Sequence, residues 1–163
     1  MTAIDDLLTR RDTTVGERPP DGGKPAPALH IVVLTCMDTR INVYDVFDLR
    51  PGEVHVLRNA GGVVTDDMLR SLAISQRKLG TREVIVMQHT TCGMTTVTED
   101  GFKDEVESAT GLRPTWSVEA FRDVEGSVRQ SVERVRRSPF VPHTDAVRGF
   151  VYDVATGGIT EVG

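Results

Sequence analysis

Three short runs of apolar residues, at 31–34, 54–57 and 84–87, restrict the fold of this chain more than any other feature. The runs are rich in valine and isoleucine, and runs of this kind are typical of strands that are buried on both faces of a parallel sheet. Two segments with apolar residues at helical spacing, 42–49 and 66–79, separate them. This alternation predicts an α/β fold whose strands are joined by right-handed crossovers.

The C-terminal half adds a long amphipathic helix and a hairpin. Apolar residues at helical spacing predict the helix over about residues 118–137, and two short runs at 149–154 and 159–162 predict the hairpin. Residues 95–115, which precede the helix, are polar, and we predict no more than a helical turn or two around 102–106. The predicted fold class is α/β, with a central mostly parallel sheet flanked by helices and a C-terminal hairpin or edge strand.

Residues 1–27 are predicted to form an N-terminal arm. A short amphipathic piece precedes a segment rich in Gly and Pro at 16–25, which cannot hold a helix or strand. Two interpretations stay open: a flexible tail, or an arm whose Leu7 and Leu8 dock on another subunit. Residues 28–163 are predicted to form a single α/β domain, since a chain of 163 residues fits one ordinary domain.

Charge and hydropathy exclude two classes of partner. The net charge is −5, and 19 basic residues are scattered among 24 acidic ones, so no concentrated basic face is available for nucleic-acid phosphates. No apolar segment approaches the roughly 20 residues that span a bilayer, and the N-terminus lacks the apolar core of a signal peptide. We expect a cytoplasmic protein that binds neither nucleic acid nor membranes.

The two cysteines, Cys36 and Cys92, lie with His89 just past the predicted ends of two strands. Ligands of open parallel sheets bind beyond the carboxyl ends of the strands, so these side chains converge if the first and third strands are neighbours. Two thiolates and an imidazole suit zinc, and three protein ligands leave one tetrahedral position for water. Taken alone, Cys36 is more often a small buried apolar residue at a strand end than a ligand, and His89-x-x-Cys92 alone is a weak motif.

Two charged residues follow Cys36 closely. Asp38 is near enough in sequence to take the fourth position on a metal ion, while Arg40 is placed to compete for the same carboxylate through a bidentate pair of hydrogen bonds. The sequence therefore predicts a site with an open and a closed form.

Three motifs resemble those of the β-class carbonic anhydrases and occur in the order of that family. They are Cys36-x-Asp38-x-Arg40, Arg-Asn-Ala-Gly at 58–61, and His89-x-x-Cys92-Gly. The resemblance covers the chain from about residue 30 to the final hairpin. It implies a zinc enzyme that converts a small-molecule substrate, carbon dioxide, reversibly to bicarbonate and a proton by attack of zinc-bound hydroxide.

The resemblance also implies roles for individual residues and an assembly. By this resemblance, one Zn²⁺ per chain is bound by Cys36, His89 and Cys92. Asp38 and Arg40 form a catalytic dyad. The small residues Ala60 and Gly61 line the substrate pocket. Family members are homodimers or dimers of dimers in which the N-terminal arm wraps round the partner. Alternative functions are hydrolysis of carbonyl sulfide or carbon disulfide at the same site, or a non-catalytic zinc-binding or thiol redox protein whose two cysteines pair under oxidation.

Overall fold

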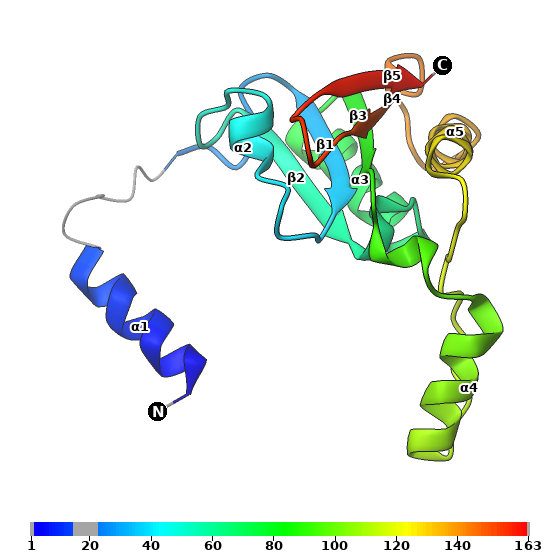
Figure 1. Cartoon of the computed structure of the whole chain (residues 1–163). Coiled ribbons are helices and arrows are strands. Elements are labelled where there is room, and N and C mark those ends of the chain that lie inside the picture. The colour runs from blue at the N-terminus through cyan, green and yellow to red at the C-terminus, as the bar shows by residue number, and fades with distance from the viewer. Residues whose placement is uncertain (1, 15–22, 163) are drawn as a thin grey trace.

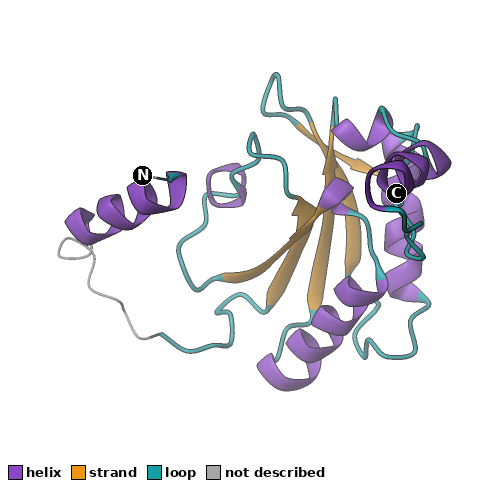
Figure 2. Ribbon diagram, turned by 90° about the horizontal axis from the view of Figure 1, so that it is seen from below, coloured by secondary structure: helices purple, strands orange, loops and turns teal. Residues whose placement is uncertain are grey.

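The computed structural model describes residues 2–14 and 23–162, and its centre is one five-stranded sheet (Figure 2). The strands lie in the order β2-β1-β3-β4-β5. All neighbouring pairs are parallel except β4 and β5, which form an antiparallel hairpin. The predicted fold class and the C-terminal hairpin are therefore confirmed, and β1 and β3 are neighbours, which was the condition for the predicted convergence. The strand bounds are β1 Ile31–Cys36, β2 Val54–Asn59, β3 Glu83–His89, β4 Val147–Tyr152 and β5 Ile159–Val162.

Two clusters of buried apolar side chains pack on the two faces of the sheet. Helices α3 (Asp66–Leu79) and α5 (Val124–Arg136) pack on one face, where their Leu72 and Val128 are fully buried. The opposite face carries a second cluster with the short helix α2 (Val43–Val46) and the loops around it. Because both faces are covered, the strands are continuously apolar, as their sequences suggest.

Helix α3 follows the prediction for residues 66–79 because its end signals are local. The Thr65 side chain accepts a hydrogen bond from the Met68 amide at the start of the helix, and Gly80 ends it in the left-handed conformation. Asp66 and Asp67 lie in the first turn, where negative side chains stabilise the helix by interacting with the positive end of its dipole.

Three helix predictions were wrong in extent. Helix α4 runs over Glu99–Thr110, where only a turn or two was expected, because Thr98 caps the Gly101 amide and Gly111 ends the helix. Helix α5 begins at Val124 instead of near residue 118. The preceding stretch is held as a loop, since the Val118 amide donates to the carboxylate of Glu99. Helix α2 has only four residues because Asp48 has a left-handed backbone, with φ of 50°.

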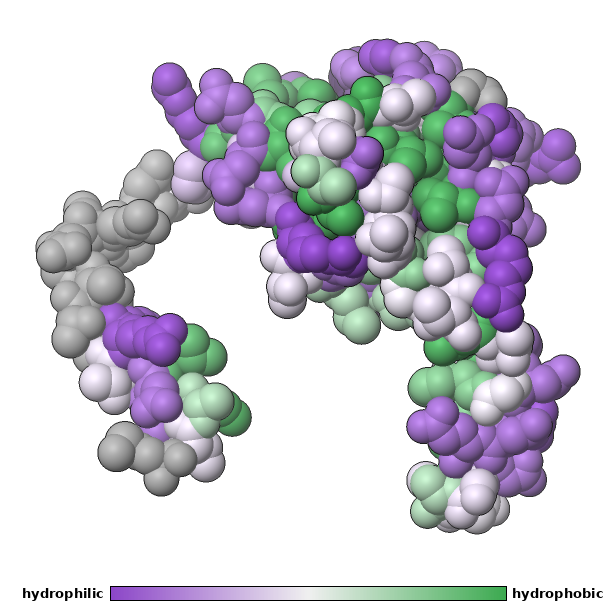
Figure 3. Space-filling view, in the orientation of Figure 1, coloured by the Kyte–Doolittle hydropathy of each residue, from purple (hydrophilic) through white to green (hydrophobic). Residues whose placement is uncertain are grey.

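Helices α1 (Ala3–Thr14) and α4 project from the body of the molecule (Figure 1). The amphipathic piece at the start of the chain is thus longer than expected, and its Ile4, Leu7 and Leu8 are exposed. Apolar atoms gather along one side of this helix (Figure 3). The Gly- and Pro-rich segment falls largely outside the described residues, and the arm boundary at residue 27 stays a prediction. Among helices of the described residues, none has the length and apolar character needed to cross a membrane.

Candidate metal centre

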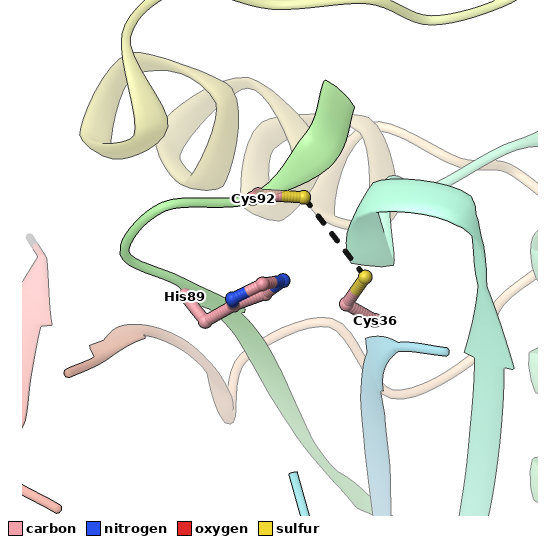
Figure 4. A group of neighbouring side chains, drawn as sticks. All are labelled: Cys36, His89 and Cys92. Atoms are coloured by element: carbon pink, nitrogen blue, oxygen red, sulfur yellow. Dashed lines mark hydrogen bonds between the residues drawn. The ribbon is translucent and has the colours of Figure 1, made fainter. Parts of the chain in front are cut away.

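The carboxyl ends of two neighbouring strands bring Cys36, His89 and Cys92 together (Figure 4). Cys36 is the last residue of β1, His89 is the last residue of β3, and Cys92 follows after a two-residue loop. The two sulfur atoms are 4.0 Å apart, and the ligand atoms of the three residues all lie within 4.8 Å of one another. All three side chains are buried. The convergence expected from the strand ends is present.

The orientation of the His89 ring fits metal binding. Its Nδ1 lies 2.9 Å from the carbonyl oxygen of Thr90, so this nitrogen donates and Nε2 carries the lone pair. Nε2 is buried and forms no hydrogen bond with any described residue. Buried polar atoms are rarely left unpaired, and a donor set of two sulfurs and one imidazole nitrogen suits zinc. The residues present therefore fit a zinc ion.

The two thiols differ in acidity. Burial opposes ionisation of Cys36, but the imidazole of His89 and the backbone amides of Asp38 and Gly61 outweigh it, so its pKa falls to about 7. Burial raises the pKa of Cys92 to about 11, and the neighbouring Cys36 adds to this effect. One thiolate thus forms readily and opposes the second, so a bound dication is needed to stabilise both as thiolates.

Asp38 and Arg40 form a bidentate pair at the rim of this group. Arg40 donates from Nε to Asp38 Oδ1 at 2.9 Å and from Nη2 to Oδ2 at 2.7 Å. These hydrogen bonds, with a third from the Arg40 amide, hold the pKa of the Asp38 carboxyl well below its usual range. Asp38 Oδ2 lies only 3.7 Å from Nε2 of His89. The carboxylate is therefore ionised, paired and close to the position of a bound ion.

Arg58 supports the loop that carries the pair. Its guanidinium donates to the carbonyl oxygens of Cys36, Ile41 and Asp38, at 2.9, 3.0 and 2.6 Å. Sequence reasoning noted this arginine only as a member of a motif and assigned it no contact. No local pattern indicates the role, because Arg58 lies on β2 and the three carbonyls lie at the end of β1 and just after it.

Gly62 allows a backbone turn to lie directly against β1. Residues Ala60–Gly62 form a short 3-10 turn after β2, and Gly62 has φ of 64°. A Cβ atom at this position would lie 2.8 Å from the Cys36 nitrogen and 2.9 Å from the carbonyl carbon of Thr35. Only glycine fits this close approach without moving the backbone that carries a candidate ligand.

A pocket of about 250 Å³ opens beside the sulfur atoms. It contains Ala60 and Gly61, as the resemblance implies, and three apolar side chains that sequence reasoning missed: Met37, Met94 and Val97. The remaining lining residues are Cys36, Asp38, Cys92 and Gly93. Val97 belongs to residues 95–115, whose pattern carried no signal, and Met94 directly precedes them. The pocket is accordingly small and largely apolar.

Two other histidines, His30 and His55, form hydrogen bonds outside this group. His55 contacts the Ser75 hydroxyl and the carbonyl oxygen of Pro25, and His30 contacts the carbonyl oxygen of Gly80. Among the described residues, the group that can hold a metal ion is Cys36, His89 and Cys92.

The chain is similar to a family model, to curated proteins and to solved structures. The family model described as carbonic anhydrase matches residues 31–117. A "Beta-carbonic anhydrase 1" of Mycobacterium tuberculosis is 51% identical, covering 99% of both chains. A "Carbon disulfide hydrolase" of Saccharolobus solfataricus is 32% identical, covering 76% of this chain and 72% of its own. Among solved structures, a carbonic anhydrase of Streptococcus mutans is similar with a TM-score of 0.94 and 35% identity, over 100% of this chain and 99% of that one.

Proposed function

The chain belongs to the β-carbonic anhydrase family, and we propose that it catalyses the zinc-dependent, reversible hydration of carbon dioxide to bicarbonate and a proton. The observation that carries this proposal is the group of two thiols and one unpaired imidazole nitrogen, which lies beside an ionised carboxylate in a small apolar pocket. Cys36, His89 and Cys92 would hold one zinc ion per chain. Bound zinc lowers the pKa of water, so that a nucleophile forms near neutral pH.

Residues around the candidate metal site would orient the nucleophile and the substrate. The Asp38 carboxylate can only accept hydrogen bonds while it is ionised, so it holds the proton of the nucleophile and directs the lone pair toward the substrate. Arg40 keeps Asp38 ionised and fixed through two hydrogen bonds. The apolar lining, with small Ala60 and Gly61, leaves room for an uncharged substrate of three atoms. Asp38 and Arg40 are the proposed catalytic dyad.

A second candidate function is hydrolysis of carbon disulfide or carbonyl sulfide at the same site. The apolar pocket and the relatives named as carbon disulfide hydrolases favour it. Carbon dioxide is the better supported substrate, because the relative named as a β-carbonic anhydrase is 51% identical over nearly the whole chain, against 32% over about three quarters of it.

Stopped-flow hydration of carbon dioxide, with metal content measured on the same sample, tests the function. We expect one zinc per chain and a specificity constant for carbon dioxide far above that for carbonyl sulfide. Asp38→Asn should keep the zinc and lose activity by about 100-fold, the scale of a positioned acid–base group. The matched control is Asp48→Asn, since Asp48 is exposed after α2 and asparagine also tolerates its left-handed backbone. Full activity of Asp38→Asn would remove the dyad from the mechanism.

Homodimers, or dimers of dimers, are the proposed assembly, and two surfaces of the chain support it. Helix α1 exposes Ile4, Leu7 and Leu8 at the i, i+3, i+4 spacing of a single helix face. A hollow of about 520 Å³ along α3 is lined by apolar and basic side chains: Leu69, Ala73, Ile74, Phe140, Arg70 and Arg77, with Asp66 at one side. Asp5 and Asp6 in the first turn of α1 complement the two arginines. Docking of α1 in this hollow on a second copy would cover both apolar surfaces.

A cytoplasmic location also stays a prediction. Fractionation of cells with an antibody against the chain is the direct measurement.

A further inference from the structure

Thr91 has an unusual backbone conformation for its residue type. Its φ is 53°, in the left-handed region. Side chains branched at Cβ rarely adopt this region, because the branch crowds the backbone. The other non-glycine residues of the described chain with positive φ are His30, Asp48 and Glu119, and none of them is branched at Cβ. Conformations of this kind persist where surrounding contacts impose them, and they gather at functional sites.

The contacts of Thr91 converge on Arg40. Arg40 Nη1 donates to the Thr91 hydroxyl at 3.1 Å, and Nη2 donates to the Thr91 carbonyl oxygen, also at 3.1 Å. The same guanidinium donates to both oxygens of Asp38. Arg40 is thus held on two sides. Because its side chain is 47% exposed, water competes for these donors, and a second anchor restricts the guanidinium more than the carboxylate alone.

The neighbouring threonine has a different task. The Thr90 hydroxyl accepts from the Val154 amide and donates to Asp153, so it ties the same loop to the turn between β4 and β5. Among the described residues, the Thr90 hydroxyl forms its hydrogen bonds with Asp153 and Val154, whereas the Thr91 hydroxyl forms its hydrogen bond with Arg40. The two residues between His89 and Cys92 therefore fix the loop in two directions, one toward the sheet and one toward the Asp38–Arg40 pair.

We propose that Thr91 is a positioning residue: its left-handed backbone presents a carbonyl and a hydroxyl to Arg40, and this anchor keeps Asp38 on the guanidinium and off the metal. The inference rests on the proposed metal site. Only 3.7 Å separates Asp38 Oδ2 from Nε2 of His89, so a carboxylate released by Arg40 has a metal ion within reach. The open form then depends on a residue of the loop that carries the ligands.

Anion binding to the cobalt-substituted protein tests the proposal, because an anion can bind only where the carboxylate does not. Thiocyanate is titrated into Co²⁺-loaded wild type, Thr91→Val, Thr91→Gly, Thr91→Ser and Thr90→Val, and visible absorption reports binding. We expect about five- to tenfold weaker binding for Thr91→Val, the scale of one ordinary hydrogen bond, because the Arg40 side chain is half-exposed to water. Thr91→Ser should stay within about twofold of wild type, since it keeps the hydroxyl.

The Thr91→Gly variant distinguishes a positioning role of the Thr91 side chain from an effect of backbone strain. Glycine adopts the left-handed backbone without crowding, so this variant should fold. If the strained backbone is all that Thr91 contributes, the Thr91→Gly protein should bind thiocyanate as well as wild type does, and that result would overturn the inference. We expect it to bind more weakly, as Thr91→Val does, with Asp38 found on the metal in its crystal structure. Equal weakening by Thr90→Val would also overturn the inference, since that variant disturbs the loop without touching Arg40.

Failure of the proposed function has a different signature. A wild-type protein that takes up no stoichiometric cobalt would overturn the metal site and this inference with it. A cobalt-loaded wild type whose spectrum does not respond to thiocyanate would leave the metal site standing and overturn this inference, because the carboxylate would already be on the metal. A wild type that responds normally, beside Thr91 variants that respond identically, would overturn the inference alone.

Discussion

The carboxyl edge of the sheet and the two projecting helices differ in how their side chains are buried and held in place. At the edge, the candidate ligands are buried, and each lies on or directly beside a strand that is paired with its neighbour. Helices α1 and α4 bury none of their described residues. Helix α4 is held by Arg113, which pairs with Asp100, Asp104 and Glu107, and by the Phe102 and Trp116 rings, 6.2 Å apart. The candidate ligands are therefore buried at the sheet edge, whereas the two projecting helices leave their side chains exposed or half-buried.

The largest expected effect tests how rigid the edge is. Gly62→Ala should destabilise the fold by about 3–5 kcal/mol, because it combines a left-handed backbone with a clash against β1. Gly52→Ala is the matched control, since Gly52 has φ of 90° but open space around it. That control should cost about 1 kcal/mol. Denaturant unfolding measures both, and equal losses would show that the close approach to β1 carries no extra cost.

An intermediate effect tests the projecting arm. Leu8→Asp should weaken self-association by about tenfold or more, because burial of one leucine contributes roughly 1.5–3 kcal/mol. Ile74→Asp, in the hollow on α3, should act similarly, while Thr9→Asp on the polar side of α1 should not. Sedimentation velocity over a concentration series measures the change, and the metal content of the dissociated chain should stay at one per chain. A Leu8→Asp variant that remains fully dimeric would refute the docking of α1.

The smallest effect concerns the attachment of α4. Lys103 and the Val118 amide lower the pKa of Glu99. A carboxyl whose folded pKa is depressed stabilises the fold above its unfolded value of 4.5, and the contribution is lost as the pH falls through the folded pKa. Glu99→Gln should therefore lower Tm by about 2 °C or less at pH 7, as for exposed ion pairs, and by progressively less below pH 4.5.

Glu105→Gln is the control for that measurement, because Glu105 forms no ion pair with a described residue. Thermal unfolding from pH 3 to 7 gives the comparison. A difference between wild type and Glu99→Gln that grows toward low pH would contradict the assigned sign.

The sequence predicted the edge much better than the projections, for a physical reason. Apolar runs show where strands end, and adjacency of β1 and β3 then suffices to bring Cys36 and His89 together. Helix α4 was underestimated because it buries none of its residues, so its apolar periodicity is weak. Helix α5 was overestimated because Val118 and Phe121 continue an apolar pattern while packing as a loop.

What the sequence determined by itself is local: the strands, the caps of α3 and the two cysteines and one histidine that emerge at strand ends. These follow from spacing and from side chains a few residues apart. Only the tertiary structure decided how Arg58 gathers three carbonyls and how Thr91 meets Arg40, 51 residues away. Such contacts depend on how separate loops pack against one another, and nothing in the neighbouring residues encodes a partner at that distance along the chain.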